Sequence, residues 1–448
     1  MENQLDKRER RNLLLFILSY VINNLASGIM YDTYVNYMQE VSRPIATSFW
    51  AFYGYATFIS AGILLLIPKT GYKKILATCV LGNALAFFIA VIFRAPALMA
   101  LATLLGLTGV QLHFIILAPF VATYTERLGE DGIKWYTRTY YMGYVGYFLS
   151  TYLGGALVVK MFSLQAGMSY SQAKIETKYV SELSKPLQEA YLAGNRQVLL
   201  AVGVIGLLAI IPVLLIKENK EDYQNVKLSD DEGPELTLKE KIQEGFKLLL
   251  NKDARAYLIY WTLISFAMGL FTSYYTVFLN RNLHIDKATS SLLVSISYVA
   301  IIIFMLFTPI TVKKLGKVGT ILLSVLLSVP FMLIIANGDK FGKAVIPVVG
   351  AALFIRAGLA NLSSPADSAL AMSVVPRELR PAYTATVNFL AGFVSIISGM
   401  FTGKFLFVTQ EGYKTAYYIA AALYVVAAAV IFFGLRKYNR GGDESGLQ

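Results

Sequence analysis

Residues 350–380 read GAALFIRAGLANLSSPADSALAMSVVPRELR, and a second apolar run continues from there to Gly399. The first run carries Arg356 in its interior and Asp367 farther along the same predicted helix. An arginine at the depth of the lipid tails costs about 2.5–3.5 kcal/mol on insertion scales, so it usually faces a bundle interior or a water-filled cavity. This stretch therefore predicts membrane helices that enclose a polar cavity.

The composition of the whole chain is that of a membrane protein. It has 448 residues, of which 56% are hydrophobic and 15% are charged, whereas a soluble chain carries about 25% charged residues. Apolar runs of about 20 residues, the length of a membrane-spanning helix, recur from end to end. Because these runs are continuous and do not alternate, a β-barrel is disfavoured. We predict an all-α polytopic membrane protein.

Twelve transmembrane helices are expected. Their approximate bounds are residues 12–37, 47–67, 75–93, 97–124, 136–161, 197–216, 256–279, 288–311, 318–336, 344–371, 382–407 and 414–435. A charged segment at residues 217–255 divides them six and six. This predicts an N-terminal six-helix bundle at residues 1–216, a cytoplasmic linker at residues 217–255, and a C-terminal six-helix bundle with a short tail at residues 256–448. Apolar residues recur at helical spacing within the linker and predict an amphipathic helix, namely Leu238, Ile242, Phe246 and Leu249.

Loop charges indicate the orientation of the chain in the membrane. With the N-terminus inside, 26 of the 40 Lys and Arg residues fall on the inner side and 13 on the outer side, and Arg356 remains in the membrane. The positive-inside rule therefore predicts both termini in the cytoplasm, with the chain in the cell membrane. The basic residues in these loops also explain the net charge of +12, so no nucleic-acid partner is expected. No cleavable signal is expected, and the single cysteine, Cys79, excludes an intramolecular disulfide.

Matching residues recur at a constant offset of 245 positions. The pairs are Tyr53 and Tyr298, Lys69 and Lys314, Gly71 and Gly316, Ser150 and Ser395, and Gly154 and Gly399. Gln111 in span four falls on Arg356 in span ten at the same offset. A constant offset through equivalent spans predicts a duplicated six-helix unit, and hence two pseudo-symmetric bundles.

The number of spans, their six-plus-six division and several local motifs resemble the major facilitator superfamily (MFS). The motifs are Gly358, Pro365, the loop VPRELR at residues 375–380 and the run FKLLLN at residues 246–251. The resemblance covers nearly the whole chain, and it implies that spans one, four, seven and ten line a central cavity. Signatures of the drug-exporting members are missing, since Pro68 and Lys313 stand where an aspartate is typical and span four has no arginine.

No enzyme signature is present in the sequence. It has no G-x-x-x-x-G-K-[ST], H-E-x-x-H or C-x-x-C motif, and its two histidines lie far apart. We therefore expect no enzymatic activity, no cofactor and no metal site. Any work of the protein is expected to draw on an ion or solute gradient.

Polar and aromatic residues of the expected cavity are the candidates for substrate binding. Spans one, four and ten contribute Asn23, Asn24, Gln111, His113, Arg356 and Asn361, most of them near the midplane when 1.5 Å is counted for each residue. Span seven contributes Tyr274 and Tyr275. Spans two, five and eight contribute Tyr53, Tyr144, Tyr147 and Tyr298, whose rings can stack on planar substrates or hold cations. Helix packing or an interfacial belt is the alternative interpretation of these tyrosines.

Charged residues inside the membrane are interpreted as functional. Arg356 is expected to bind an anionic or strongly polar group of the substrate, and the alternative is a structural pair with Asp32, Asp367 or a backbone carbonyl. Asp32, Asp367 and His113 are the candidate proton carriers. The alternative for the two carboxylates is that they only reach the outer and the inner interface.

These expectations combine into a secondary transporter that moves a small polar or anionic organic solute by alternating access. We expect a proton as the coupling ion, the lipid bilayer as the surroundings, and a monomer. Two alternatives stay open. One is an exporter of amphipathic drugs or lipids, and the other is a membrane sensor that has the same fold but does not transport.

Overall fold

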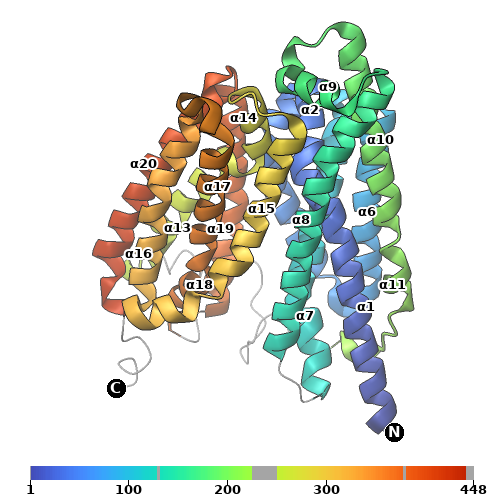
Figure 1. The fold of residues 1–448 in the computed structure, drawn as a ribbon. Helices are drawn as coiled ribbons and strands as arrows, with labels where there is room; N and C mark the ends of the chain where they lie inside the picture. The colour runs from blue at the N-terminus through green and yellow to red at the C-terminus, as the bar shows by residue number, and fades with distance from the viewer. Residues whose placement is uncertain (1, 129–131, 225–249, 377–379, 440–448) are drawn as a thin grey trace. The chain divides into compact units, whose positions relative to one another are not determined.

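The described residues of the protein form helices. The computed structural model describes residues 2–128, 132–224, 250–376 and 380–439, and every regular element in these ranges is helical (Figure 1). Eleven helical segments of this part are long and apolar enough to cross a membrane, and the shorter apolar helix α4 (Phe49–Leu64) corresponds to the remaining predicted span. The prediction of an all-α polytopic fold is confirmed. The predicted amphipathic helix of the linker and residues 377–379 lie outside the described residues.

Contacts between Cα atoms group the chain into two compact units. Unit 1 comprises Met1–Leu228 and Ser273–Ser295, and unit 2 comprises Ser229–Thr272 and Ile296–Gln448. The main helices of unit 1 are α1 (Glu2–Ile29), α2 (Val35–Val41), α4, α6 (Tyr72–Ile92), α7 (Pro96–Leu128), α8 (Gly132–Gln165), α9 (Tyr170–Glu176), α10 (Lys185–Leu207), α11 (Ile210–Leu215) and α14 (Tyr275–Arg281). Those of unit 2 are α13 (Lys252–Phe271), α16 (Thr308–Ala336), α17 (Val345–Leu362), α18 (Ser364–Ser373), α19 (Arg380–Phe401) and α20 (Glu411–Leu435). Helix α15 (Lys287–Met305) begins in unit 1 and ends in unit 2.

Small residues allow α1 and α8 to pack closely in unit 1. An added Cβ at Gly146 would lie 3.1 Å from the carbonyl oxygen of Val21, and one at Gly143 would lie 2.5 Å from the ring of Tyr20. Helices whose backbones approach this closely gain dispersion contacts, which is the usual stabilising term where lipid surrounds a bundle. The small residues of span five therefore position α1, which leads into the π-helical turn that carries Asp32.

Several of the predicted spans are interrupted, and two of these interruptions lie beside charged residues. The first contains a π-helical turn at Met30–Tyr34, between α1 and α2. The tenth divides into α17 and α18 at Ser363, and Pro365 lies in the first turn of α18. Proline has no N–H to donate to the preceding turn, which explains why the helix restarts at this point. Arg356 and Asp367 consequently lie on two successive helices and do not share one continuous helix.

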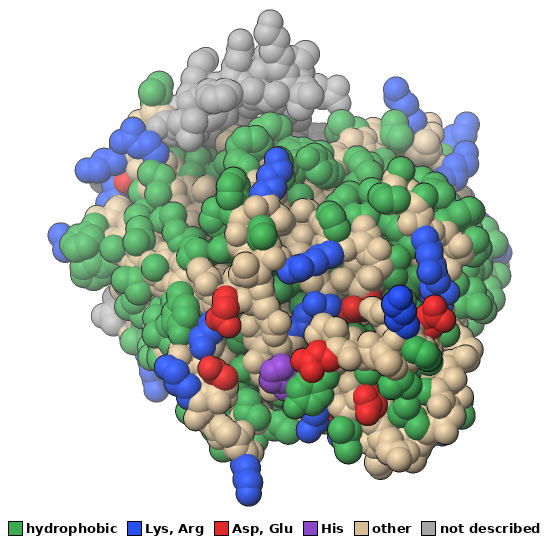
Figure 2. Space-filling view, turned by 90° about the horizontal axis from the view of Figure 1, so that it is seen from above, with side chains coloured by type: hydrophobic (Ala, Val, Ile, Leu, Met, Phe, Trp, Pro, Cys, Tyr) green, Lys and Arg blue, Asp and Glu red, His purple; other side chains and the backbone are tan. Residues whose placement is uncertain are grey.

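The end of the structure with α9 and α14 carries charges of both signs. Figure 2 shows this end from above, with acidic and basic side chains interspersed among apolar ones. Within unit 1, α9 and the 3-10 turn Thr177–Glu182 pack on a buried cluster that includes Val159, Phe162 and Val180. The segment at residues 162–196 is therefore an ordered cap on the unit.

A structural feature that we call the clasp occurs once in each unit. In unit 1, Gly71 has φ +81° before α6, and the Glu218 carboxylate accepts hydrogen bonds from the first amides of that helix, Tyr72 N (2.6 Å) and Lys73 N (3.2 Å). In unit 2, Gly316 has φ +79°. There Asn439 accepts hydrogen bonds through its carbonyl oxygen from Lys317 N (3.1 Å) and through Oδ1 from Gly319 N (2.9 Å). In unit 1 the capping residue follows α11, and in unit 2 it follows α20 and caps the part of α16 that begins at the kink of Gly316.

The clasps make Gly71 and Gly316 sensitive to substitution. Alanine at either position would have to combine a positive φ with an extended ψ (164° at Gly71 and 174° at Gly316), a conformation that costs a residue with a Cβ about 1–3 kcal/mol. Its Cβ would also collide with Glu218 or with Asn439. We expect Gly71→Ala and Gly316→Ala each to lower the midpoint of thermal unfolding in detergent. Gly62→Ala is the control, because no atom lies within 4 Å of an added Cβ there. Equal midpoints for all three variants would show that the clasps do not stabilise the fold.

Candidate functional site

Unit 1 contains a buried ion pair. Asp32 lies in the π-helical turn of the first span, and its Oδ1 is 2.7 Å from Nζ of Lys287 at the start of α15. Its Oδ2 accepts a hydrogen bond of 2.8 Å from the Ser291 hydroxyl. Asp32 and Lys287 are each 1% exposed. Asp32 therefore does not simply reach an interface, because a buried ammonium group balances its charge.

Further hydrogen bonds hold the ion pair in place. The backbone N–H of Lys287 donates to Thr177 Oγ1 (3.2 Å), and Asn36 donates both to the carbonyl oxygen of Asp32 (2.8 Å) and to Thr276 Oγ1 (2.7 Å). Sequence reasoning missed Lys287, because a lysine just ahead of an apolar run is indistinguishable from a loop charge. One signal could have pointed to Lys287. Asp32 lies inside an apolar span and needs a positive counter-charge, and a lysine at the edge of another span is a candidate for it.

A second polar face of unit 1 lies between α4 and α7. The rings of Trp50 and Tyr53 are stacked with centroids 4.4 Å apart and an interplanar angle of 3°. Gln111 donates a hydrogen bond of 3.2 Å to Thr57 Oγ1, and its amide also lies against the Tyr53 hydroxyl. The indole N–H of Trp50 is buried and has no hydrogen-bond partner among the described residues. This face combines flat aromatic surface with amide and hydroxyl groups, and it brings together two predicted site residues, Tyr53 and Gln111.

The tyrosines of α8 form a continuous ladder. Tyr140 and Tyr144 share a hydrogen bond of 3.1 Å between their hydroxyls, and the rings of Tyr144 and Tyr147 are 6.1 Å apart. Tyr147 in turn lies 6.3 Å from the ring of Tyr31 in the first span. Tyr144 and Tyr147, two of the predicted site residues, thus lie on one half-buried aromatic stripe.

Three other predicted residues of unit 1 lie in the packed core. Asn23 accepts a hydrogen bond of 2.8 Å from Asn83 on α6, whereas Asn24 donates to the carbonyl oxygen of Tyr20 and packs against α8. His113 is 0% exposed and lies between aromatic rings, including that of Tyr20 at 5.6 Å. Neither of its ring nitrogens has a hydrogen-bond partner within the described part of the chain. In this structure these residues contribute to helix packing.

In unit 2, Arg356 is buried against an aromatic ring. It is 3% exposed, and its guanidinium carbon lies 4.7 Å from the centroid of the Phe271 ring. Tyr424 on α20 is close enough to interact with it electrostatically. A ring face can stabilise a guanidinium that is removed from water. The described residues contain no ion pair between Arg356 and Asp367.

Asp367 lies in an environment of tyrosines. Its carboxylate faces the hydroxyls of Tyr257 and Tyr260 on α13, and Tyr383 on α19 is close to it as well. The Tyr257 and Tyr383 rings are 6.2 Å apart. Phenolic hydroxyls are neutral donors, so they stabilise a carboxylate without cancelling its charge. Of these groups, only Asp367 was predicted from the sequence.

The remaining predicted residues are scattered. The hydroxyl of Tyr274 donates to the carbonyl oxygen of Thr47 (3.0 Å), and its ring is buried. Asn361 donates to the carbonyl oxygen of Ala357 in its own helix. Tyr275 and Tyr298 are half-buried.

Comparison with known families decides what kind of protein this is. The sequence model of the Major Facilitator Superfamily matches residues 12–398, with a second match at residues 262–446. The chain belongs to the Major Facilitator Superfamily. It is therefore a multi-pass membrane protein of a transporter family, and the predicted resemblance is confirmed. A search of curated proteins finds no match to the chain.

Solved structures of several MFS transporters have the same fold. The nucleoside transporter NupG aligns with a TM-score of 0.72 at 15% identity, covering 95% of this chain and 99% of NupG. The xylose transporter XylE from E. coli aligns with a TM-score of 0.60 at 13% identity, covering 96% and 98% of the two chains. The fucose:proton symporter FucP from E. coli aligns with a TM-score of 0.56 at 16% identity, covering 95% and 98%. At these identities the likeness shows the fold alone.

The buried ion pair of this MFS protein gives a prediction about stability. Removing one partner leaves an uncompensated buried charge, which typically costs about 3–5 kcal/mol. We expect Asp32→Asn and Lys287→Met each to lower the thermal unfolding midpoint clearly, and the double variant to recover most of the loss. Asp339→Asn is the matched control, because Asp339 pairs with Lys414 at the surface, where an ion pair contributes at most about 1 kcal/mol. If the double variant is no more stable than the single variants, Asp32 and Lys287 do not compensate each other's charge.

Proposed function

We propose that this MFS protein is a secondary transporter of a small polar or anionic organic solute. It moves the solute across the cell membrane by alternating access, with protons as the coupling ion and with both termini in the cytoplasm. The observation that carries the proposal is Arg356, a guanidinium that is 3% exposed within an apolar helix of 18 residues. An intramembrane charge is expensive to maintain and usually marks a substrate or ion pathway.

Arg356 is the residue proposed to recognise the polar group of the solute. The face of Phe271 lies beside the guanidinium and stabilises it as a cation. Several N–H groups lie in one plane in arginine, which suits a carboxylate, a phosphate or a pair of hydroxyls. The same chemistry supports the predicted preference for polar or anionic solutes.

The α4–α7 face of unit 1 is proposed to bind a flat part of the solute. Trp50 and Tyr53 offer stacked rings, and Gln111 offers an amide that can pair with a polar ring edge. The buried indole N–H of Trp50 supports the same role, because a donor without a partner inside the described protein suits a ligand acceptor. Nucleosides have this chemistry and are the transported solute of NupG, so they belong in the first set of compounds to be tested.

The Asp32–Lys287 pair and the Asp367–tyrosine cluster are the proposed proton-coupling groups. Each places a carboxylate in a largely buried position, beside the Lys287 ammonium group in one case and beside tyrosine hydroxyls in the other. Neutralising either carboxylate would weaken its contacts, and this is how a bound proton can change the stability of one conformation relative to another. His113 is left out of the proposal because it lies inside the aromatic core.

Export of amphipathic drugs or lipids is the second candidate function. The tyrosine ladder of α8 favours it, because stacked phenols bind flat apolar cations. Flux assays in proteoliposomes separate the candidates, with labelled acids, sugars, nucleosides, peptides and cationic drugs as the solutes. Saturable flux of the polar compounds would support the proposal. Flux restricted to the drugs would favour export, and binding without flux would indicate a sensor.

The planar guanidinium gives the first functional prediction. Arg356→Lys keeps the positive charge but loses the paired N–H groups, so we expect solute flux to fall about tenfold or more, since hydrogen bonds to charged groups contribute about 1.5–3 kcal/mol. The measurement is the initial rate of uptake in proteoliposomes at matched protein content. Arg94→Lys, at an exposed position, is the control. Unchanged flux in Arg356→Lys would remove this residue from the binding site.

The carboxylates give the second functional prediction. Asp367→Asn keeps the size and polarity of the side chain but no longer titrates, so we expect flux that does not respond to an imposed pH gradient while downhill exchange continues. Asp32→Asn is measured in the same way after its folding has been checked. Asp339→Asn should keep the full response. If both buried variants also keep it, neither carboxylate carries the coupling proton.

A further inference from the structure

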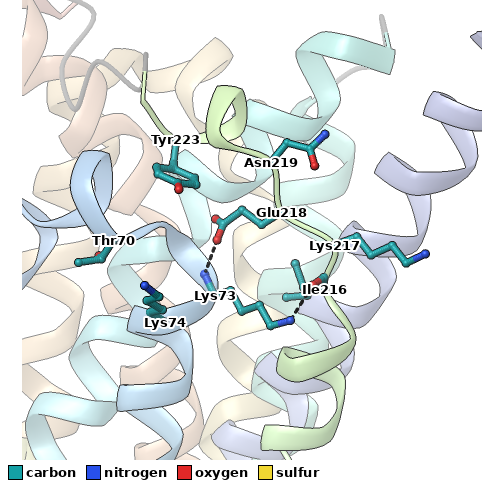
Figure 3. Close-up of a pocket in the computed structure, with 8 residues that line it drawn as sticks. All are labelled: Thr70, Lys73, Lys74, Ile216, Lys217, Glu218, Asn219 and Tyr223. Atoms are coloured by element: carbon teal, nitrogen blue, oxygen red, sulfur yellow. Dashed lines mark hydrogen bonds between the residues drawn. The ribbon is translucent and has the colours of Figure 1, made fainter.

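A pocket of about 480 Å³ opens in unit 1, at the end of the unit where α6 begins and α11 ends (Figure 3). One wall is the turn α5 (Ile67–Thr70) with the first residues of α6. The other wall is the segment from Ile216 to Tyr223, which we call the strap. The positive-inside distribution predicts that this end faces the cytoplasm.

Basic side chains predominate around the pocket. Lys73, Lys74 and Lys217 line it, against the single carboxylate of Glu218. Nζ of Lys73 donates to the carbonyl oxygens of Leu214 (2.5 Å) and Ile216 (3.1 Å), which holds its charge at the wall. Lys74 and Lys217 are exposed and make no side-chain hydrogen bond or ion pair with other described residues. Figure 3 shows Lys74 on the α6 wall and Lys217 extending along the outer side of the strap.

The one carboxylate of the pocket is already engaged by the protein. Glu218 accepts the amide hydrogens of Tyr72 and Lys73 at the start of α6. Burial raises the pKa of Glu218 above its usual range, while these two amides oppose the shift. Its negative charge is therefore directed at the amides that begin α6, and the exposed charged side chains that line the pocket are basic.

The strap is fixed before any ligand binds. Asn12 bonds the backbone of Lys217 in both directions, with Nδ2 donating to the carbonyl oxygen (2.8 Å) and Oδ1 accepting from the amide (3.1 Å). The buried carboxylate of Asp222 pairs with Arg127 and with Arg8 (3.2 Å). A rigid wall lowers the ordering cost of binding.

Exposed apolar side chains lead directly into both walls. Leu65 and Leu66, which precede α5, are 65% and 45% exposed, and Leu214 and Leu215, at the end of α11, are 57% and 52% exposed. In a membrane protein such leucines face lipid tails, so the pocket lies where the tails meet the head groups. A ligand that contacts both the leucines and the lysines must carry acyl chains as well as an anionic group.

We propose that this pocket binds the head group of an anionic phospholipid, with its phosphate near Lys74 and Lys217 and its acyl chains along Leu65, Leu66, Leu214 and Leu215. Basic pockets between helices on the cytoplasmic side of membranes recognise such head groups. The proposal concerns the lipid neighbours of the protein and is independent of the transported solute.

The test compares the full-length chain with two double variants. Lys74→Gln/Lys217→Gln removes the two exposed ammonium groups of the pocket. Lys69→Gln/Lys220→Gln removes one lysine from each of the same two segments but outside the pocket, so it matches the change in net charge. Detergent-purified proteins are titrated with phosphatidylglycerol, phosphatidylethanolamine or phosphatidylcholine, and lipid retention is measured by native mass spectrometry with the thermal midpoint as a second readout.

We expect the wild-type chain and the matched control to retain phosphatidylglycerol in preference to both zwitterionic lipids. The pocket variant should bind phosphatidylglycerol about tenfold more weakly, because each basic residue near the membrane surface contributes several-fold. Inorganic phosphate and glycerol phosphate form a separate arm. If they compete as well as the lipid does, the site is one for a soluble anion and the lipid assignment is wrong. An equal loss in both double variants, or a preference for phosphatidylethanolamine, would also overturn the proposal.

Discussion

A charge inside a bilayer must find its compensation within the protein, because lipid tails offer neither a counter-charge nor a hydrogen bond. This protein meets that constraint in different ways. Lys287 is balanced by Asp32, which also accepts a hydrogen bond from Ser291, in unit 1, whereas Arg356 lies against the Phe271 ring in unit 2. The two environments differ in kind, because the lysine is paired with a carboxylate while the guanidinium lies over an aromatic face. This difference is consistent with the proposed division of roles, in which the ion pair is one of the proton-coupling groups and the arginine recognises the solute.

The two clasps show how a duplicated architecture is preserved while its chemistry diverges. Gly71 and Gly316 keep nearly the same backbone conformation, and each lies beside a polar residue that caps amides at the start of a following span. The two units differ in the group that accepts these hydrogen bonds, which is a carboxylate in unit 1 and a neutral asparagine in unit 2. The charged version lies next to a lysine-lined pocket. A structural requirement, the unsatisfied N–H groups of a helix terminus, is therefore met twice, and one of the two solutions borders the proposed lipid pocket.

Much of the candidate site could be listed from the sequence but not assembled from it. Gln111 and Tyr53 were predicted separately, and the structure places the Gln111 amide against the Tyr53 hydroxyl. Asn23 and His113 were chosen by depth along a helix, yet their side chains lie in interhelical packing. Depth follows from counting residues, whereas the direction of a side chain depends on how each helix is rotated against its neighbours. Lys287 was missed for a related reason, since its burial arises only when α15 packs beside the first span.

Composition, apolar run length and the 245-residue offset determined the class of this protein by themselves. Those features follow from the thickness of a bilayer and from the internal repeat of the sequence, and they need no knowledge of which helices touch. Tertiary structure alone decided which charges are paired, where the tenth span divides, and how the strap forms a pocket with α5 and α6. Each of these depends on contacts between residues far apart in the chain. Such contacts are set by packing in three dimensions and leave no period in the sequence.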